Sequence, residues 1–251
     1  MKRLLQLFIL PLFIGFCFSN CKSGVKKQDL KSNALTDTEV RGNWQLLFNG
    51  KDFTGWHAFK QKIVGDNWIV DPTEQAIQVH KAEGSTTHGE GDLTTDGEYE
   101  NYELRLDWKI SACGNSGIIY NVLETDSLNA TYQSGPEMQV LDNTCHPDAK
   151  IIKHRAGDLY DMISCSVENV KPAGEWNSIR LVCNKGKVEH WQNEQKLVEY
   201  DQNAPTWKTM IAGSKFKKMP LFGTSRKGKI ALQDHGDKVW YRNIKIMRIK
   251  S

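Results

Sequence analysis

The sequence predicts an all-β domain, built as an antiparallel two-sheet sandwich of the jelly-roll type. Beyond residue 40, apolar and polar side chains alternate in short runs, as expected of strands with one face in a core and one in solvent. No apolar pattern of helical period is long enough there to define a helix. Turn-forming residues separate the runs, and Trp and Tyr are spread through them, which is typical of β-sandwiches.

The clearest strand is expected over residues 102–110. Its even positions from Leu104 to Ile110 are apolar, and its odd positions from Glu103 to Lys109 are charged. Because successive side chains of a strand point to opposite faces, one set should pack inside and the other should meet solvent. Similar runs predict further strands at 67–70, 76–80, 117–122, 137–141, 176–183, 187–192, 196–200, 229–235 and 239–249, with a hairpin turn at 192–195 in which Asn193 tolerates a positive φ.

The N-terminus is typical of an exported bacterial lipoprotein. Two basic residues precede an apolar run over 4–18, and small and polar residues then lead to Cys21. This run is too short for a spanning helix, so we expect residues 1–20 to be a signal peptide of the lipoprotein type. Cys21 would then be the lipidated first residue; ordinary signal cleavage nearby is the alternative, because Asn20 is less usual at such a site.

The next segment, residues 21–40, is polar and basic and is expected to be a flexible tether. The remaining residues, 41–251, are enough for one β-sandwich domain and contain no evident linker. The expected location is therefore the cell envelope, with the membrane contacted through the lipid anchor alone. Because the tether is basic rather than acidic, we expect the domain to face the periplasm. The sequence does not predict an oligomeric state.

Charge argues against a nucleic-acid partner. The whole chain carries a net charge of +3, and residues 1–40 hold six Lys and Arg against three Asp and Glu. The domain is left with 27 residues of each sign and is formally neutral. A nucleic-acid-binding domain normally carries a basic surplus gathered on one face.

Four cysteines of the domain allow three complete pairings. Cys183 falls in step with the apolar positions of its strand and is expected to be a buried thiol. Cys145 and Cys165 lie in polar surroundings and are the better candidates for a disulfide. No cysteine or histidine spacing resembles a zinc site, and we expect neither a metal ion nor an organic cofactor.

Acidic and amide residues in one strand form the first candidate site. Glu137 and Gln139 share a strand face, and a bulge after position 140 would bring Asp142 to the same face. Concave-sheet β-glucanases space two catalytic carboxylates in the same way, although Gln139 in the middle position departs from that pattern. The alternative is a solvent-facing polar strand in which Asp142 begins a turn.

Other polar residues are candidates for sugar contacts. Asp107 and Lys109 lie on the charged face of the 102–110 strand, which either lines a sugar groove or is an ordinary solvated face. Gln233 and His235 share a face of a later strand. Tyr160 either donates a hydrogen bond to a sugar or anchors a strand with its ring.

Several sequence blocks resemble the 3-keto-disaccharide hydrolase family. They fall in the order of that family and span most of residues 44–249, with small departures at Phe53 and at the Asn193-Glu194 turn. The blocks are LFNGKDFTGW at 47–56 with Leu46 before it, DWK at 107–109, NSGI at 115–118, EMQVLD at 137–142, GDLY at 157–160, GEWN at 174–177, LQDHG at 232–236 and YRNI at 241–244.

The resemblance implies a concanavalin A-like sandwich with a sugar-facing sheet, and hydrolysis of glycosides oxidised at carbon 3. A ketone at carbon 3 acidifies the proton on carbon 2, so a base can form an enolate that expels the aglycone from carbon 1, and water then adds. This route needs a base, an enolate stabiliser and an acid for the leaving oxygen.

The candidate roles follow from the residue types. Glu137 or His235 would be the base, Lys109 or Arg242 the enolate stabiliser, and Asp107 or Asp142 an acid or orienting group. Gln139, Tyr160, Gln233 and Arg242 would contact the sugar. We expect Glu137, Asp142, Lys109 and His235 to converge on one groove. The alternatives are a non-catalytic carbohydrate-binding module and a conventional two-carboxylate glycosidase.

Overall fold

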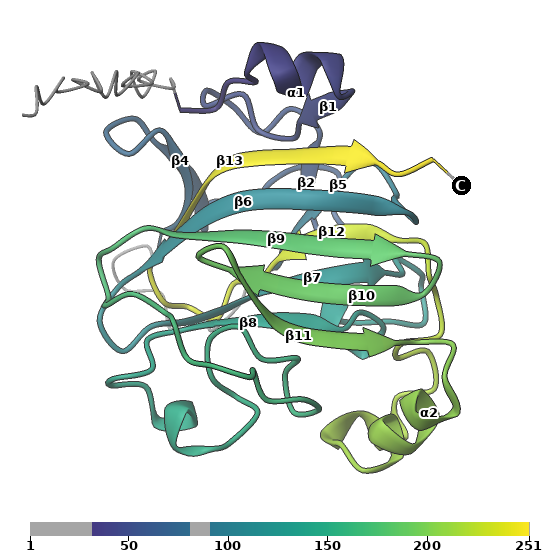
Figure 1. Ribbon diagram of the computed structural model, residues 1–251. Helices are drawn as coiled ribbons and strands as arrows, with labels where there is room; N and C mark the ends of the chain where they lie inside the picture. The colour runs from purple at the N-terminus through teal and green to yellow at the C-terminus, as the bar shows by residue number, and fades with distance from the viewer. Residues whose placement is uncertain (1–31, 81–90, 251) are drawn as a thin grey trace, which may run out of the picture.

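The computed structural model describes residues 32–80 and 91–250 and consists of two antiparallel β-sheets (Figure 1). In chain order the elements are α1 Asp37–Arg41, β1 Trp44–Leu46, β2 Trp56–Ala58, β3 Trp68–Asp71, β4 Ala76–Val79, β5 Leu93–Thr95, β6 Tyr102–Ile110, β7 Asn115–Val122, η1 Thr131–Gln133, β8 Glu137–Leu141, η2 Pro147–Lys150, β9 Asn177–Asn184, β10 Lys187–Gln192, β11 Gln195–Asp201, α2 Pro205–Ala212, η3 Lys215–Lys218, β12 Lys229–Leu232 and β13 Val239–Arg248.

The larger sheet, called sheet A, has eight strands in the order β11-β10-β9-β6-β13-β4-β3, with β1 also paired to β13. The smaller sheet, called sheet B, has five strands in the order β2-β5-β12-β7-β8. Figure 1 shows the long strands of sheet A in front, with β7 and β12 of sheet B behind them. The predicted fold class, an all-β antiparallel sandwich of the concanavalin A type, is confirmed.

The core lies between the sheets and is filled from both of them. In β6 the side chains of Leu104, Leu106, Trp108 and Ile110 are buried in it, as the alternation predicts. The charged residues between them, including Lys109, project from the outer face of sheet A. Sheet B contributes its own inward set, for example Ile118 of β7 and Met138 of β8. The apolar period of two therefore decides which side chains meet between the sheets.

The hairpin between β10 and β11 has the turn that the sequence predicts. Asn193 and Glu194 have φ values of 47° and 69°, the pattern of a type I′ turn, whose twist matches that of the paired strands. The helices were not predicted and are short. The longest, α2, begins with Pro205, whose fixed φ and missing N–H suit the first helical position, and it buries Trp207.

Part of the expected tether is packed on the domain. Asn33 and Asn243 exchange backbone-to-side-chain hydrogen bonds of 2.7 and 2.8 Å, and Thr36 and Glu39 form a capping box at the start of α1. The tether prediction is thus wrong for residues 32–40, because local capping and the Asn pair order them. The expected signal peptide, Cys21 and residues 21–31 lie outside the described residues. No helix within the described ranges is long and apolar enough to span a bilayer.

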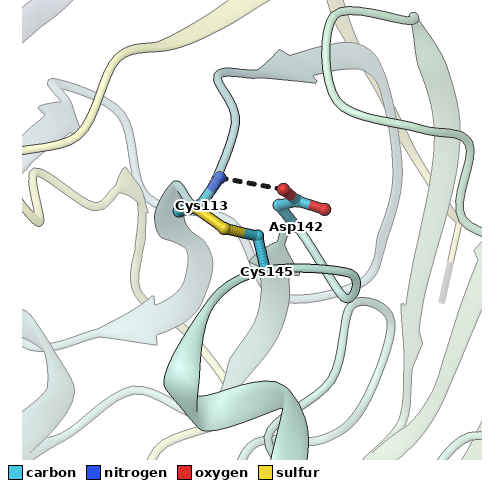
Figure 2. Close-up of side chains that lie close together, drawn as sticks. All are labelled: Cys113, Asp142 and Cys145. Atoms are coloured by element: carbon cyan, nitrogen blue, oxygen red, sulfur yellow. Dashed lines mark hydrogen bonds between the residues drawn. A yellow bond between two sulfur atoms is a disulfide. The ribbon is translucent and has the colours of Figure 1, made fainter.

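The disulfide joins Cys113 to Cys145, which corrects the predicted pairing of Cys145 with Cys165 (Figure 2). The register of β7 on β8 places Asn115 opposite Leu141, so the turn before β7 lies beside the loop after β8. Local polarity cannot reveal this long-range neighbour relation. Cys165 is a half-buried free thiol, and Cys183 is the buried free thiol that was expected.

Candidate active site

The candidate site lies on the outer face of sheet B. Residues that pair directly across an antiparallel ladder share a face, and Gly117 and Ile119 of β7 pair with Gln139 and Glu137 of β8. Since Met138 between them is in the core, Glu137 and Gln139 must project outward. Loops from several parts of the chain cover this face, which explains why both side chains are nonetheless almost fully buried.

A pocket of about 160 Å³, called the Glu137 pocket, is built on this face. It brings together five residues that the sequence singled out, and they come from three separate stretches of the chain. Those five are Glu137, Gln139, Tyr160, Gln233 and His235; Asn115, Tyr132 and Lys215 complete the lining. An adjoining cleft of about 610 Å³ shares Tyr132, Gln233 and His235 with it. Together the two cavities offer space on the scale of a sugar-containing ligand.

Glu137 is the most perturbed group of this pocket. Its side chain is 4% exposed, and among the described residues no hydrogen bond to its carboxyl is present. Burial raises the pKa of Glu137 to about 8; the nearby Lys215 charge opposes this, and Asp92 and Asp148 add to it. The carboxyl is therefore mostly protonated at neutral pH and close to the point where it exchanges its proton.

Gly117 gives the Glu137 side chain its space. A Cβ atom added at Gly117 would overlap the Glu137 carboxyl. Gly117 pairs across the ladder with Gln139, the next outward-facing residue after Glu137 on β8. Because Gly117 has no side chain, the Glu137 carboxyl can lie over it. The glycine here serves close packing rather than backbone freedom, because its φ is not positive.

Gln139 presents an acceptor toward the pocket. Its Nε2 donates to Asn115 Oδ1 at 3.0 Å, while its Oε1 is buried and has no partner among the described residues. A buried amide oxygen without a partner loses the hydrogen bonds that it had with water. Gln139 is thus positioned to accept a hydrogen bond from a hydroxyl of a bound molecule.

Lys215 brings a positive charge to the pocket. Its Nζ lies 3.8 Å from the ring centre of Tyr160, and its backbone N–H donates to Asp161 Oδ2 at 2.6 Å. Burial lowers the pKa of Lys215, opposed by the carboxylates of Glu137, Asp161 and Asp148. Sequence reasoning missed this residue, because its Lys-Phe-Lys-Lys surroundings are typical of a solvated basic stretch.

Tyr160 and His235 stand at the pocket wall and mouth. The Tyr160 hydroxyl donates to Asp148 Oδ2 at 3.4 Å, and burial raises its pKa, so it remains a proton donor. His235 is half-exposed, with its ring 6.3 Å from that of His146 and its Nδ1 3.9 Å from Asp237. Both side chains present O–H or N–H groups where a leaving oxygen could be met.

Asp142 does not line the Glu137 pocket. Its carboxylate accepts a hydrogen bond from Cys113 N at 2.8 Å (Figure 2). It also accepts hydrogen bonds from Thr144 N and Oγ1 at 3.0 and 2.7 Å. Burial raises the pKa of Asp142, but these hydrogen bonds outweigh burial and hold the pKa below its usual value. Asp142 with Cys113 and Cys145 would have the spacing of metal ligands, yet the two sulfurs are joined to each other. Asp142 therefore fixes the loop beside the disulfide.

Three other predicted residues lie on the opposite side of the molecule. Asp107, Lys109 and Arg242 belong to β6 and β13 of sheet A and project from its outer face. Lys109 is bound to Glu74 at 2.6 Å and stacked on Trp240, while Arg242 stacks on Trp176 at 3.8 Å. The expected convergence of Lys109 with Glu137 is thus wrong. Alternation shows that a residue faces outward, but it does not show from which sheet.

Comparison with known proteins shows the family of this chain. Residues 43–247 match the family described as 3-keto-alpha-glucoside-1,2-lyase-like domain. A curated Bacteroides thetaiotaomicron protein named 3-keto-disaccharide hydrolase is 38% identical over 223 residues, which cover 80% of this chain and 76% of that protein. The crystal structure of a candidate glycosyl hydrolase from Parabacteroides distasonis is 35% identical with a TM-score of 0.80, covering 88% of this chain and 100% of that one.

A second crystal structure of a candidate glycosyl hydrolase from P. distasonis is 25% identical, with a TM-score of 0.54, and covers 77% of this chain and 99% of that one. The predicted enzyme class, a glycosidase-like hydrolase, is confirmed at the level of the family. The chain belongs to the 3-keto-alpha-glucoside-1,2-lyase-like family.

Proposed function

We propose that this enzyme cleaves glycosides and disaccharides oxidised at carbon 3, by elimination of the aglycone followed by hydration, with Glu137 moving the proton. The observation that carries the proposal is the buried Glu137 carboxyl, whose pKa of about 8 suits proton exchange near neutral pH. The names of the related proteins support the substrate class, since one is a lyase-like family and one a hydrolase of 3-keto sugars. Elimination followed by hydration accounts for both names.

The reaction needs one acid–base group that works in both directions. The Glu137 carboxylate takes the proton from carbon 2, and the enolate electrons then form the carbon 1–carbon 2 double bond as the bond from carbon 1 to the leaving oxygen breaks. Tyr160 or His235 donates a proton to that oxygen. The hydroxyl of a water molecule then adds to carbon 1, the other proton of that water restores the deprotonated Tyr160 or His235, and the protonated Glu137 returns a proton to carbon 2. The net result is hydrolysis, with Glu137 regenerated.

Lys215 replaces Lys109 and Arg242 as the proposed enolate stabiliser. It lines the Glu137 pocket, whereas the other two cations lie on sheet A. An ammonium group near the developing charge on the carbon 3 oxygen lowers the energy of the enolate more than that of the ketone. Asn115, Gln139 and Gln233 supply amide groups that orient the sugar hydroxyls.

A conventional two-carboxylate mechanism receives less support. Among the described residues that line the Glu137 pocket itself, Glu137 is the single carboxylic acid. The adjoining cleft adds Asp92 and Asp234, whose oxygens already accept hydrogen bonds within the protein. Its predicted partner, Asp142, is held by three hydrogen bonds in the loop beside the disulfide. Elimination does not require a second carboxylate at a fixed separation, which is why the pocket fits it better.

The test compares a 3-keto-glucoside with the unoxidised glucoside, with product release followed by chromatography. We expect release from the oxidised compound alone, and a loss of about 10²-fold or more for Glu137→Gln, the scale of a positioned acid–base group. Glu74→Gln, on the outer face of sheet A, is the matched control and should keep its rate. Equal release from both glucosides would point to a conventional glycosidase, and binding without release to a binding module.

We also propose that the chain is exported and anchored to the envelope by lipid at Cys21, with the domain facing the periplasm. The N-terminal pattern supports this, as does the solvent-exposed Cys113–Cys145 disulfide, since such bonds persist in oxidising compartments. Cys21→Ala should move the protein from the membrane to the soluble fraction. Unchanged membrane fractionation of that variant would count against the anchor.

A further inference from the structure

A second cavity lies on the outer face of sheet A, on the side of the sandwich opposite to Glu137. Its volume of about 450 Å³ is within the range of small-molecule sites. Its lining comes from β10, β9, β6 and β13, which are neighbours in sheet A (Figure 1), and from the N-terminal segment that carries α1. The lining residues that the argument uses are Glu39, Asp107, Ser178, Arg180, Trp191 and Lys245.

The charges that line this sheet A cavity balance. Three carboxylates and three cations are present, so the formal sum is zero. The cations are already engaged. Arg105 contacts Glu103 at 2.6 Å, Arg180 lies 3.9 Å from the same carboxylate, and Lys245 pairs with Glu39. A phosphate or carboxylate ligand would therefore find no unpaired cation among these described lining residues and would meet the carboxylates as well.

The floor of the sheet A cavity keeps polar atoms that can form hydrogen bonds with a ligand. The Asp107 carboxylate accepts a hydrogen bond from Asn243 Nδ2 at 2.6 Å through one oxygen, and no hydrogen bond from the described residues reaches the other oxygen. Burial raises the pKa of Asp107, opposed by the hydrogen bond from Asn243. Ser178 lies directly across the β6–β9 ladder from Asp107 and adds an exposed hydroxyl. The floor thus offers an acceptor beside a group that both donates and accepts.

An indole ring borders these polar groups. Trp191 of β10 is half-buried and stands directly opposite Arg180 of β9, whose guanidinium lies 3.8 Å from the ring centre. Stacking on the guanidinium and the hydrogen bond from Nε1 to Glu189 at 2.7 Å fix the orientation of the ring. A pre-oriented aromatic surface binds with a small loss of side-chain entropy.

We propose that the sheet A cavity is a second carbohydrate-binding site, which holds a neutral oligosaccharide apart from the reaction at Glu137. Sugar hydroxyls both donate and accept, so they match a lining of balanced charge with carboxylate and hydroxyl groups side by side. The apolar C–H face of a sugar ring packs on an aromatic ring such as Trp191. Because the two sites lie on opposite outer faces, such binding keeps the enzyme on a glycan while the Glu137 pocket stays open.

The experiment titrates the domain with cellohexaose, maltohexaose and laminarihexaose in separate calorimetric runs. We expect at least one of these unoxidised oligosaccharides to bind at millimolar concentration or below. Trp191→Ala should weaken that binding by about tenfold or more, the usual scale for removing a central aromatic contact. Ser178→Tyr, at an exposed position that tolerates a larger side chain, should abolish it by filling the cavity.

Controls separate this site from the Glu137 pocket. Trp240→Ala removes an indole from the same sheet face outside the cavity and should leave the affinity unchanged. Glu137→Gln should bind the oligosaccharide as the wild type does, while Trp191→Ala should turn over a small 3-keto-glucoside at the wild-type rate. Absence of binding by all three oligosaccharides overturns the proposal. Binding that survives both cavity variants, or that is lost in Glu137→Gln, overturns it too, and neither result bears on the reaction proposed for Glu137.

Discussion

Replacement of Glu137 by Gln should make the protein less active and, at alkaline pH, more stable. The folded-state pKa of Glu137 is about 8, against 4.5 for an unperturbed Glu. Because the folded state holds the proton more tightly, the stability that this group contributes is complete below pH 4.5 and is lost as the pH rises toward 8. At about 1.36 kcal/mol for each pKa unit, the loss reaches about 5 kcal/mol.

The informative quantity is the difference in unfolding free energy between the Glu137→Gln variant and the wild type at two pH values, because the amide of the variant does not titrate. Urea unfolding followed by tryptophan fluorescence would measure it at about pH 5 and about pH 9. The variant should gain about 3 to 5 kcal/mol relative to the wild type between these values. Titrating groups that do not interact with Glu137 are common to both proteins and cancel, whereas Asp92 and Lys215, whose charges act on Glu137, contribute to the difference. A difference that does not change with pH would refute the perturbed pKa.

Three further outcomes follow from the same structure. The kcat/KM for a 3-keto-glucoside should rise about tenfold per pH unit below about 8 and then level off, since ionised Glu137 is the base; a flat profile would count against this role. Gly117→Ala should lower turnover by displacing the Glu137 carboxyl while the domain stays folded, which circular dichroism would verify. Joint replacement of Cys113 and Cys145 by Ser should reduce the unfolding free energy by about 3 to 4 kcal/mol, from the 32-residue separation, whereas Cys165→Ser should change it little.

Alternation along single strands made much of the fold predictable. The burial of Leu104 and Trp108 and the outward position of Asp107 follow from a period of two, which is a local property. The same reasoning placed Glu137 with Gln139 on a shared strand face, and both line one pocket. Gln233 and His235 line it too, but from the loop after β12, because the strand expected over 229–235 ends at Leu232. The turn at Asn193 was equally local.

Long-range relations were not accessible in this way. Lys109 was expected near Glu137, but β6 belongs to sheet A and β8 to sheet B, and alternation cannot assign a strand to a sheet. Lys215 is the first residue of η3, which follows α2. This segment has no apolar pattern that would place Lys215 at the Glu137 pocket. The pairing of Cys113 with Cys145 depends on the register of β7 on β8.

Isotope labelling of the product tests the central claim, that Glu137 moves the proton of carbon 2, most directly. A 3-keto-glucoside is turned over in deuterium oxide, and the released sugar is analysed by mass spectrometry and NMR. Because Glu137 exchanges its proton with solvent and returns one to carbon 2, the sugar should carry deuterium at that carbon, and Glu137→Gln should form it at a rate lower by about 10²-fold or more. Product released without deuterium at carbon 2 would contradict the elimination route and the role of Glu137 in it.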